Sequence, residues 1–111
     1  MLFRSWEGYA ANVFERSEKV NCYAKNDHLG FQIFYLWNGS RRRYVPDFIV
    51  KDHIGNTLVL EIKGQKSTQN DAKHAALEEW IAAINGDQRF RTWSWAVAYS
   101  PVEVDNIVAN L

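Results

Sequence analysis

The sequence predicts a single α/β domain, residues 1–111, with a mixed sheet flanked by helices. With 111 residues, 47% of them hydrophobic, the chain can bury the core of one small domain. Patterns typical of helices and strands follow one another in the order helix, three strands, helix, strand. Neighbouring strands joined by short turns pair antiparallel, and a crossover through a helix adds a parallel strand. These observations together favour a mixed sheet.

The first third of the chain predicts a helix followed by strand-forming residues. The helix is expected to begin at Ser5, an N-capping residue, and to run to about Lys19, because apolar residues recur at helical spacing. The pattern over 20–25 is compatible with a further short strand. The run 31–37 is rich in aromatic and β-branched residues and predicts the first of the three strands, which ends at the turn 38–40.

The middle of the chain predicts a hairpin with an acid near one end of each strand. Strands are expected over 43–51 and 57–63, joined by a short turn. If this turn is centred on Ile54, the pairing register places Asp47 opposite Glu61, with side chains about 5 Å apart. A slip of one residue would move one carboxylate to the other face of the sheet, so the prediction depends on the turn.

The last third predicts the crossover. A second helix is expected over 70–85, where apolar residues follow one side of the helix and Gly86 ends it. The final strand is expected over 93–99, before Pro101. Because a helix separates the strands 57–63 and 93–99, we expect them to pair in parallel.

The two acids and a nearby lysine indicate metal-assisted hydrolysis of a phosphodiester. Side chains alternate along a strand, so Glu61 and Lys63 share one face. Two close carboxylates repel unless a proton or a cation lies between them, and Mg²⁺ commonly binds one or two carboxylates together with water and substrate phosphates. Lys63 could then orient the attacking water and stabilise charge on the reacting phosphate. The alternative is that Asp47 and Glu61 are hydrated residues at strand ends, with Lys63 paired to one of them.

These residues resemble the motif of the PD-(D/E)xK nuclease superfamily, which Pro46-Asp47 and Glu61-Ile62-Lys63 match. More narrowly, the chain is similar to the C-terminal endonuclease domain of type III restriction enzyme Res subunits. The similar stretches cover residues 5–7, 23–31, 44–50, 58–64 and 80–85.

The resemblance implies a restriction-endonuclease-like αβββαβ core and Mg²⁺-dependent cleavage of DNA, with no nucleotide bound by this domain. Asp47 and Glu61 would be ligands of Mg²⁺, and Lys63 would position the attacking water. Glu7 would be the acid that many members direct from the first helix to the metal, with Glu15 and Glu18 as competitors. The implied partners are DNA, a helicase-type motor in the same parent chain and a methyltransferase (Mod) subunit.

Basic residues gather in the middle of the chain although the net charge is zero. Residues 41–73 hold seven Lys or Arg against four Asp or Glu, and local potential rather than total charge attracts phosphate. We therefore predict DNA phosphate contacts at Gln65, Lys66, Lys73 and Arg43. A solvated surface position is the alternative for each. The glycine spacing of a phosphate-binding P-loop is absent around Lys66, so ATP binding is not expected.

The remaining features predict a cytoplasmic protein that does not bind membranes. Cys22 is the only cysteine and cannot form an internal disulfide, and no apolar stretch reaches the length of a membrane span or a signal-peptide core. Two other functions stay open: a nuclease-fold domain that binds DNA or a partner without catalysis, and a stand-alone resolvase or repair nuclease.

Overall fold

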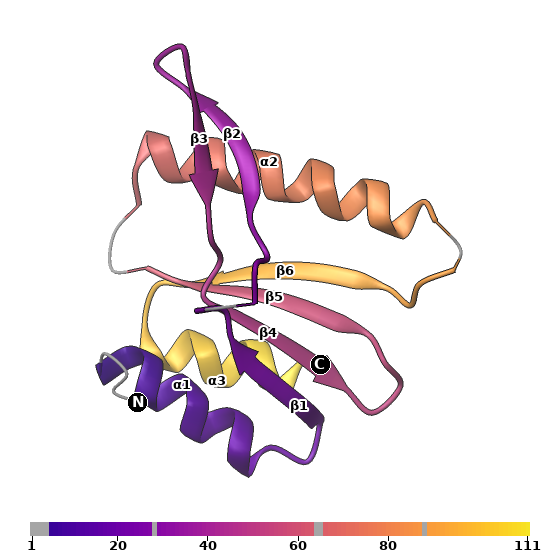
Figure 1. Ribbon diagram of the computed structural model, residues 1–111. Helices are drawn as coiled ribbons and strands as arrows, with labels where there is room; N and C mark the ends of the chain where they lie inside the picture. The colour runs from indigo at the N-terminus through magenta and orange to yellow at the C-terminus, as the bar shows by residue number, and fades with distance from the viewer. Residues whose placement is uncertain (1–4, 28, 64–65, 88) are drawn as a thin grey trace.

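Four strands form the central sheet of the computed structural model, which describes residues 5–27, 29–63, 66–87 and 89–111 (Figure 1). Their order across the sheet is β1 (Val20–Lys25), β4 (Phe48–Asp52), β5 (Thr57–Ile62) and β6 (Trp93–Ala98). β4 pairs antiparallel with β1 and β5, and β6 runs parallel to β5. The predicted mixed sheet, with its parallel last strand, is confirmed.

A hairpin of two strands, β2 (Ile33–Trp37) and β3 (Ser40–Tyr44), is inserted between β1 and β4 and forms a small sheet of its own. Its two-residue loop, Asn38-Gly39, has positive φ at both positions, 51° and 76°. That backbone suits the twist of a hairpin, and Asn and Gly tolerate it best. The tip of the hairpin projects beyond the layers of helix and sheet (Figure 1).

Two strand predictions need correction. The strand predicted over 31–37 was expected to join the central sheet, but it pairs only within the hairpin, and β1 holds the edge position beside β4 instead. The strand predicted over 43–51 is broken between Tyr44 and Phe48. Pro46 lies in this break, and because proline has no N–H to donate, it interrupts a ladder of hydrogen bonds.

Helices cover both faces of the sheet (Figure 1). α1 (Ser5–Arg16) and α3 (Pro101–Ala109) pack on one face, and α2 (Thr68–Asn85) lies on the other together with the hairpin. α3 was not predicted from the sequence, although Ser100 caps it and Pro101 occupies its first turn. α2 begins two residues earlier than expected, after Ser67, whose side chain accepts a hydrogen bond from the N–H of Asn70.

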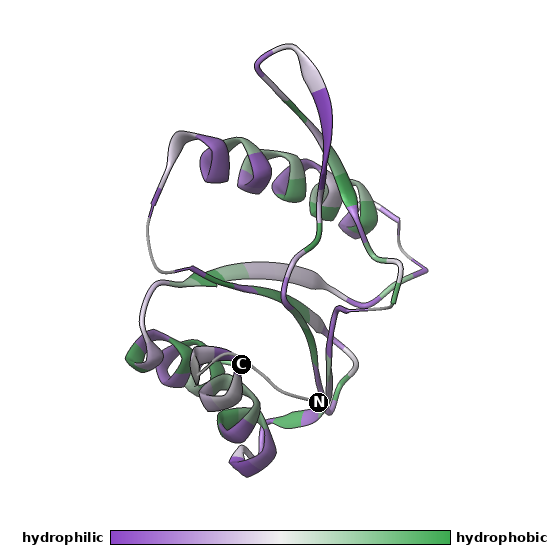
Figure 2. Cartoon of the chain, turned by 60° about the vertical axis from the view of Figure 1, so that its left-hand side comes forward, coloured by the Kyte–Doolittle hydropathy of each residue, from purple (hydrophilic) through white to green (hydrophobic). Residues whose placement is uncertain are grey.

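The core has two parts, one on each face of the sheet. The part under α1 and α3 includes Phe14, Phe48, Leu58, Leu60, Ile62 and Val104. The part under α2 includes Ile33, Tyr35, Tyr44, Val59, Leu77 and Ile81. All six residues of β5 are buried, and Figure 2 colours the strands at the centre of the fold as largely hydrophobic. Since side chains alternate along β5, Glu61 lies on the same face as Val59, under α2.

Among the described residues, no helix combines the length and the apolar character that crossing a membrane would require.

Candidate active site

Asp47 and Glu61 lie side by side at one end of the β4–β5 pair. Phe48 is the register partner of Leu60, so the next positions outward are Asp47 and Glu61, as the sequence predicted. Asp47 precedes β4, and its Oδ2 accepts a hydrogen bond of 2.7 Å from the N–H of Ile62. This bond holds the Asp47 carboxylate against the end of β5. Burial of Glu61 and the charge of the neighbouring Asp47 both raise the pKa of Glu61.

The Glu61 carboxyl is buried, with 2% of the residue exposed. Burial raises its pKa to about 7, and the charge of Asp47 adds to this effect. Two groups act in the opposite direction: Tyr44, whose hydroxyl donates a hydrogen bond to Oε2, and Lys63, whose Nζ lies 3.4 Å from Oε1. At neutral pH the Glu61 carboxyl is therefore poised between its protonated and ionised forms.

Tyr44 is a site residue that was not predicted from the sequence. It ends the hairpin strand β3, is buried under α2, and donates its hydroxyl proton to Glu61. Burial and the charge of Glu61 raise the pKa of Tyr44, so its hydroxyl keeps the proton and remains a donor. The contact crosses from the small sheet to the central sheet, and no local sequence pattern indicates such a pairing.

Lys63 follows β5 and shares the face of Glu61, as predicted. Its N–H donates to the carbonyl of Ala98 at 3.0 Å, which continues the parallel pairing beyond the end of the strand. The side chain is 28% exposed. The ammonium group thus lies beside the Glu61 carboxylate and remains accessible from solvent.

Glu7 is buried in α1 and forms an ion pair with Lys25, at 3.0 Å. Lys25 is the register partner of Phe48, one residue from Asp47, and Phe48 belongs to the core under α1. Glu7 and Asp47 therefore lie near the same end of the β1–β4 pair, on opposite faces of the sheet. Within the ranges that the structure describes, no three His, Cys, Asp or Glu residues form a metal-binding group. The role of Glu7 as the first-helix acid stays a prediction.

The competing first-helix acids lie elsewhere. Glu15 is exposed and accepts a hydrogen bond of 2.8 Å from the hydroxyl of Tyr23. Glu18 is exposed beyond the end of α1, where its carbonyl oxygen contacts His53.

Asn26 is a second residue of the site that was not predicted from the sequence. It is buried, and its side-chain amide donates to the carbonyls of Phe31 (2.8 Å) and Pro46 (3.0 Å), at the two ends of the inserted hairpin. Its N–H donates to the carbonyl of Asp47 at 2.8 Å. Asn26 therefore fixes the segment that carries Asp47. In the sequence it resembles an ordinary turn residue, because the carbonyls it binds are distant along the chain.

The predicted DNA contacts that the structure describes lie at different places. The Nζ of Lys73 lies 5.7 Å from the ring centre of Tyr44, and the Nζ of Lys66 lies 5.2 Å from the ring centre of Tyr99. Arg43 is exposed on β3, next to Tyr44. Gln65 lies outside the described residues.

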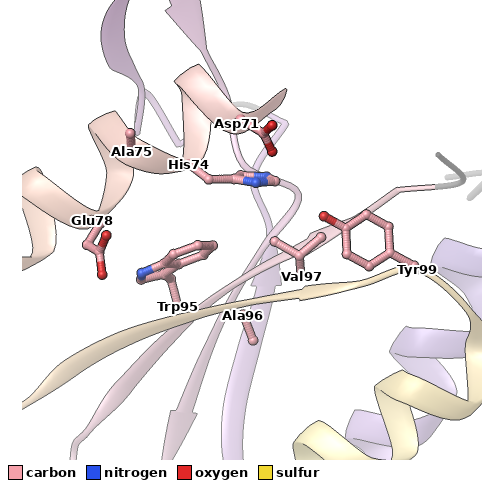
Figure 3. Close-up of a pocket in the computed structure, with 8 residues that line it drawn as sticks. All are labelled: Asp71, His74, Ala75, Glu78, Trp95, Ala96, Val97 and Tyr99. Carbon is pink, nitrogen blue, oxygen red and sulfur yellow. The ribbon is translucent and has the colours of Figure 1, made fainter. Parts of the chain in front are cut away.

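An open cavity of about 570 Å³ lies between α2 and β6 (Figure 3). Val97 lines it and is the register partner of Glu61. His74 and Trp95 also line it, with ring centres 5.4 Å apart, and burial lowers the pKa of His74, which favours the neutral ring. Asp71 and Glu78 add negative charge to the lining, so the cavity suits a neutral or cationic group better than a phosphate.

The paired carboxylates fit a hard divalent cation. Both can supply oxygen ligands, and burial together with the charge of Asp47 raises the pKa of Glu61, so that a second negative charge is unfavourable there. A bound cation would remove this repulsion.

No protein-family model, no curated protein and no solved structure matches the chain.

Proposed function

We propose that the chain is a restriction-endonuclease-like domain that hydrolyses phosphodiester bonds in DNA with Mg²⁺, most like the cleavage module of a type III restriction enzyme Res subunit. The observation that carries the proposal is the convergence of Asp47, Glu61 and Lys63 at one end of the β4–β5 pair. The element order also supports it. Without the inserted hairpin, α1, β1, β4, β5, α2 and β6 follow one another as helix, three strands of one sheet, helix and strand, the αβββαβ order of PD-(D/E)xK nucleases.

Each side chain has a role in this proposal. Asp47 and Glu61 would hold Mg²⁺, which when bound supplies a water of lowered pKa and positive charge next to the phosphate. Lys63 would orient that water and neutralise charge that builds up on the reacting phosphate. Tyr44, by donating to Oε2 of Glu61, would fix the orientation of the carboxylate and leave Oε1, on the side of Lys63, to contact the metal. Lys66, Lys73 and Arg43 would contact DNA phosphates.

The proposal extends to the setting in which such domains act. We propose a cytoplasmic enzyme in which a helicase-type motor of the same parent chain and a methyltransferase subunit act together with this domain. The stand-alone resolvase or repair nuclease would use the same site on another DNA substrate, so substrate preference separates the two functions.

Nicking of supercoiled plasmid tests the proposed activity. The purified chain is expected to convert plasmid to open circles with Mg²⁺ and not with EDTA, and Asp47→Asn and Glu61→Gln should each abolish nicking. Glu79→Gln, which removes one exposed carboxylate from α2, is the matched control and should nick like the wild type. A folded chain that binds DNA but never nicks it, alone or within its parent enzyme, would favour the non-catalytic alternative.

A thermal shift tests Asp47 as a metal ligand. Saturating Mg²⁺ should raise the melting temperature of the wild type by several degrees, because ligand binding to the folded state stabilises it, and Asp47→Asn should lose this rise. Without metal, Asp47→Asn should melt no lower than the wild type, because the substitution removes the repulsion with Glu61 and keeps an oxygen that can accept from the Ile62 N–H.

Asp47→Ala should behave differently in the same assay. It leaves the Ile62 N–H without its acceptor, at a cost of about 1–3 kcal/mol, so its melting temperature should fall even without metal. An equal Mg²⁺ shift in the wild type and Asp47→Asn would remove Asp47 from the set of ligands.

A further inference from the structure

We propose that the β2–β3 hairpin is an arm that docks in a groove of duplex DNA through its outer face, formed by Phe34, Leu36, Arg41 and Arg43. The proposal rests on the proposed function, because the DNA that the arm binds is the substrate of the Asp47–Glu61 site. It adds apolar contacts and a defined surface to the single phosphate contact predicted at Arg43.

The two faces of the arm differ in burial. On the inner face, Ile33, Tyr35 and Tyr44 are buried against α2, and the hydroxyl of Tyr35 accepts a hydrogen bond of 2.8 Å from Gln69. On the outer face, Phe34 is 47% and Leu36 72% exposed. The inner face therefore anchors the arm to the domain, and the outer face presents large apolar side chains to solvent.

On the outer face of the arm, apolar side chains lie next to guanidinium groups. Phe34 is the register partner of Arg43, and Leu36 is the register partner of Arg41. The guanidinium carbon of Arg41 lies 3.8 Å from the ring centre of Phe34. Basic side chains on a strand can simply discourage aggregation, but that role does not explain the large exposed apolar residues opposite them on the neighbouring strand. Apolar groups beside cations suit a partner that offers both anionic groups and apolar edges.

Charge and shape favour DNA as this partner. The hairpin, residues 33–44, holds three arginines and no acid, and Figure 2 shows a hydrophilic stretch near its projecting tip. A two-stranded β-ribbon fits the major groove, which is about 12 Å wide. The arginines would bind backbone phosphates on either side, while Phe34 and Leu36 would contact sugars and base edges such as thymine methyl groups.

The arm lies only a few residues from the carboxylates along the chain. Arg43 precedes Asp47 by four residues, a span of at most about 14 Å, which is less than half of the roughly 34 Å turn of a DNA helix. In the same segment, Tyr44 donates its hydroxyl proton to Glu61. A groove engaged by the arm therefore belongs to the same stretch of duplex as the phosphate at Asp47 and Glu61.

Binding of a fluorescent 30-base-pair duplex by the whole chain, in EDTA and over a range of salt, tests the arm. Arg41→Gln/Arg43→Gln should lower affinity at least tenfold and reduce the slope of log affinity against log salt by about 2, because two phosphate contacts are lost. Phe34→Ser/Leu36→Ser should lower affinity severalfold and leave the slope unchanged, because no charge is removed.

Matched controls lie elsewhere on the surface. Arg16→Gln/Arg91→Gln removes the same net charge from two exposed arginines, and Ile54→Ser/Val102→Ser removes two apolar side chains of comparable exposure. Both controls should bind within about twofold of the wild type. Melting temperatures verify that all four double variants are folded.

The outcomes distinguish failure of the DNA-binding arm from failure of the proposed nuclease activity. If both arm variants bind like their controls while Asp47→Asn still abolishes cleavage, the proposal that the arm binds DNA is overturned and the proposed function stands. If the arm variants lose binding but the wild type never cleaves DNA, alone or within its parent enzyme, DNA binding by the arm is supported and the proposed nuclease activity is overturned. Equal losses in Arg41→Gln/Arg43→Gln and in its control would show an effect of net charge alone, which also overturns the arm.

Discussion

Replacement of Lys63 by alanine is expected to slow DNA cleavage by at least ~10²-fold while the fold remains nearly as stable as in the wild type. The ammonium group lies 3.4 Å from Glu61, beside the carboxylates that would hold the metal, and its side chain is partly exposed at the end of β5. Loss of a group that stabilises charge only in the transition state costs on the order of 3 kcal/mol of activation free energy. The small side chain of alanine leaves no buried cavity at this position.

Cleavage rates at saturating Mg²⁺ measure this effect. Saturation is needed because Lys63 also lowers the pKa of Glu61, so its loss can weaken metal binding as well as chemistry. Lys66→Ala is the control: Lys66 is exposed and packs near Tyr99, so its loss should weaken DNA binding and lessen the salt dependence without abolishing cleavage. A Lys63→Ala variant that cleaves within a few-fold of the wild type, beside an inactive Lys66→Ala, would reverse the two roles.

The parts of the site that the sequence predicted depend on neighbours within one hairpin. A short turn and the alternation of side chains determine the β4–β5 register, so the meeting of Asp47 and Glu61 follows from local information. The residues that hold this pair come from distant segments. Tyr44 reaches Glu61 from the inserted hairpin, and Asn26 binds the Asp47 carbonyl from the end of β1.

The same distinction explains the errors in the fold. β1 includes exposed residues, among them Asn21 and Cys22, because it is an edge strand, so its sequence lacks the clear apolar alternation of a central strand. The run 31–37 has the stronger strand pattern, and it does form a strand. Its apolar residues, however, either pack against α2 or are exposed to solvent, and none of the strand joins the central sheet. Strand propensity identified the segment but carried no information on its partner.

Without metal, the free energy of unfolding should fall as the pH rises from about 4.5 to about 7, because of Glu61. Its folded-state pKa, raised to about 7 from an ordinary value of 4.5, means that the folded protein holds a proton that the unfolded chain has lost over this range. Stability therefore decreases with pH until the folded carboxyl also ionises. The full difference is roughly 3 kcal/mol, at about 1.4 kcal/mol for each tenfold change in proton affinity.

Urea denaturation in EDTA at pH 5, 6, 7 and 8 measures this contribution as the difference between the wild type and Glu61→Gln. The difference is needed because His74 acts in the opposite direction: burial lowers its folded-state pKa below 6.5, so its own contribution increases with pH up to that value. Glu61→Gln should equal or exceed the wild type in stability at pH 8 and lose the decline between pH 5 and 7, while Glu79→Gln should keep the wild-type profile. Parallel profiles for the wild type and Glu61→Gln would show that the Glu61 carboxyl ionises as readily in the folded protein as in the unfolded chain. Added Mg²⁺ should restore stability to the wild type at pH 8 and not to Glu61→Gln, because a bound cation offsets the charge of the ionised pair.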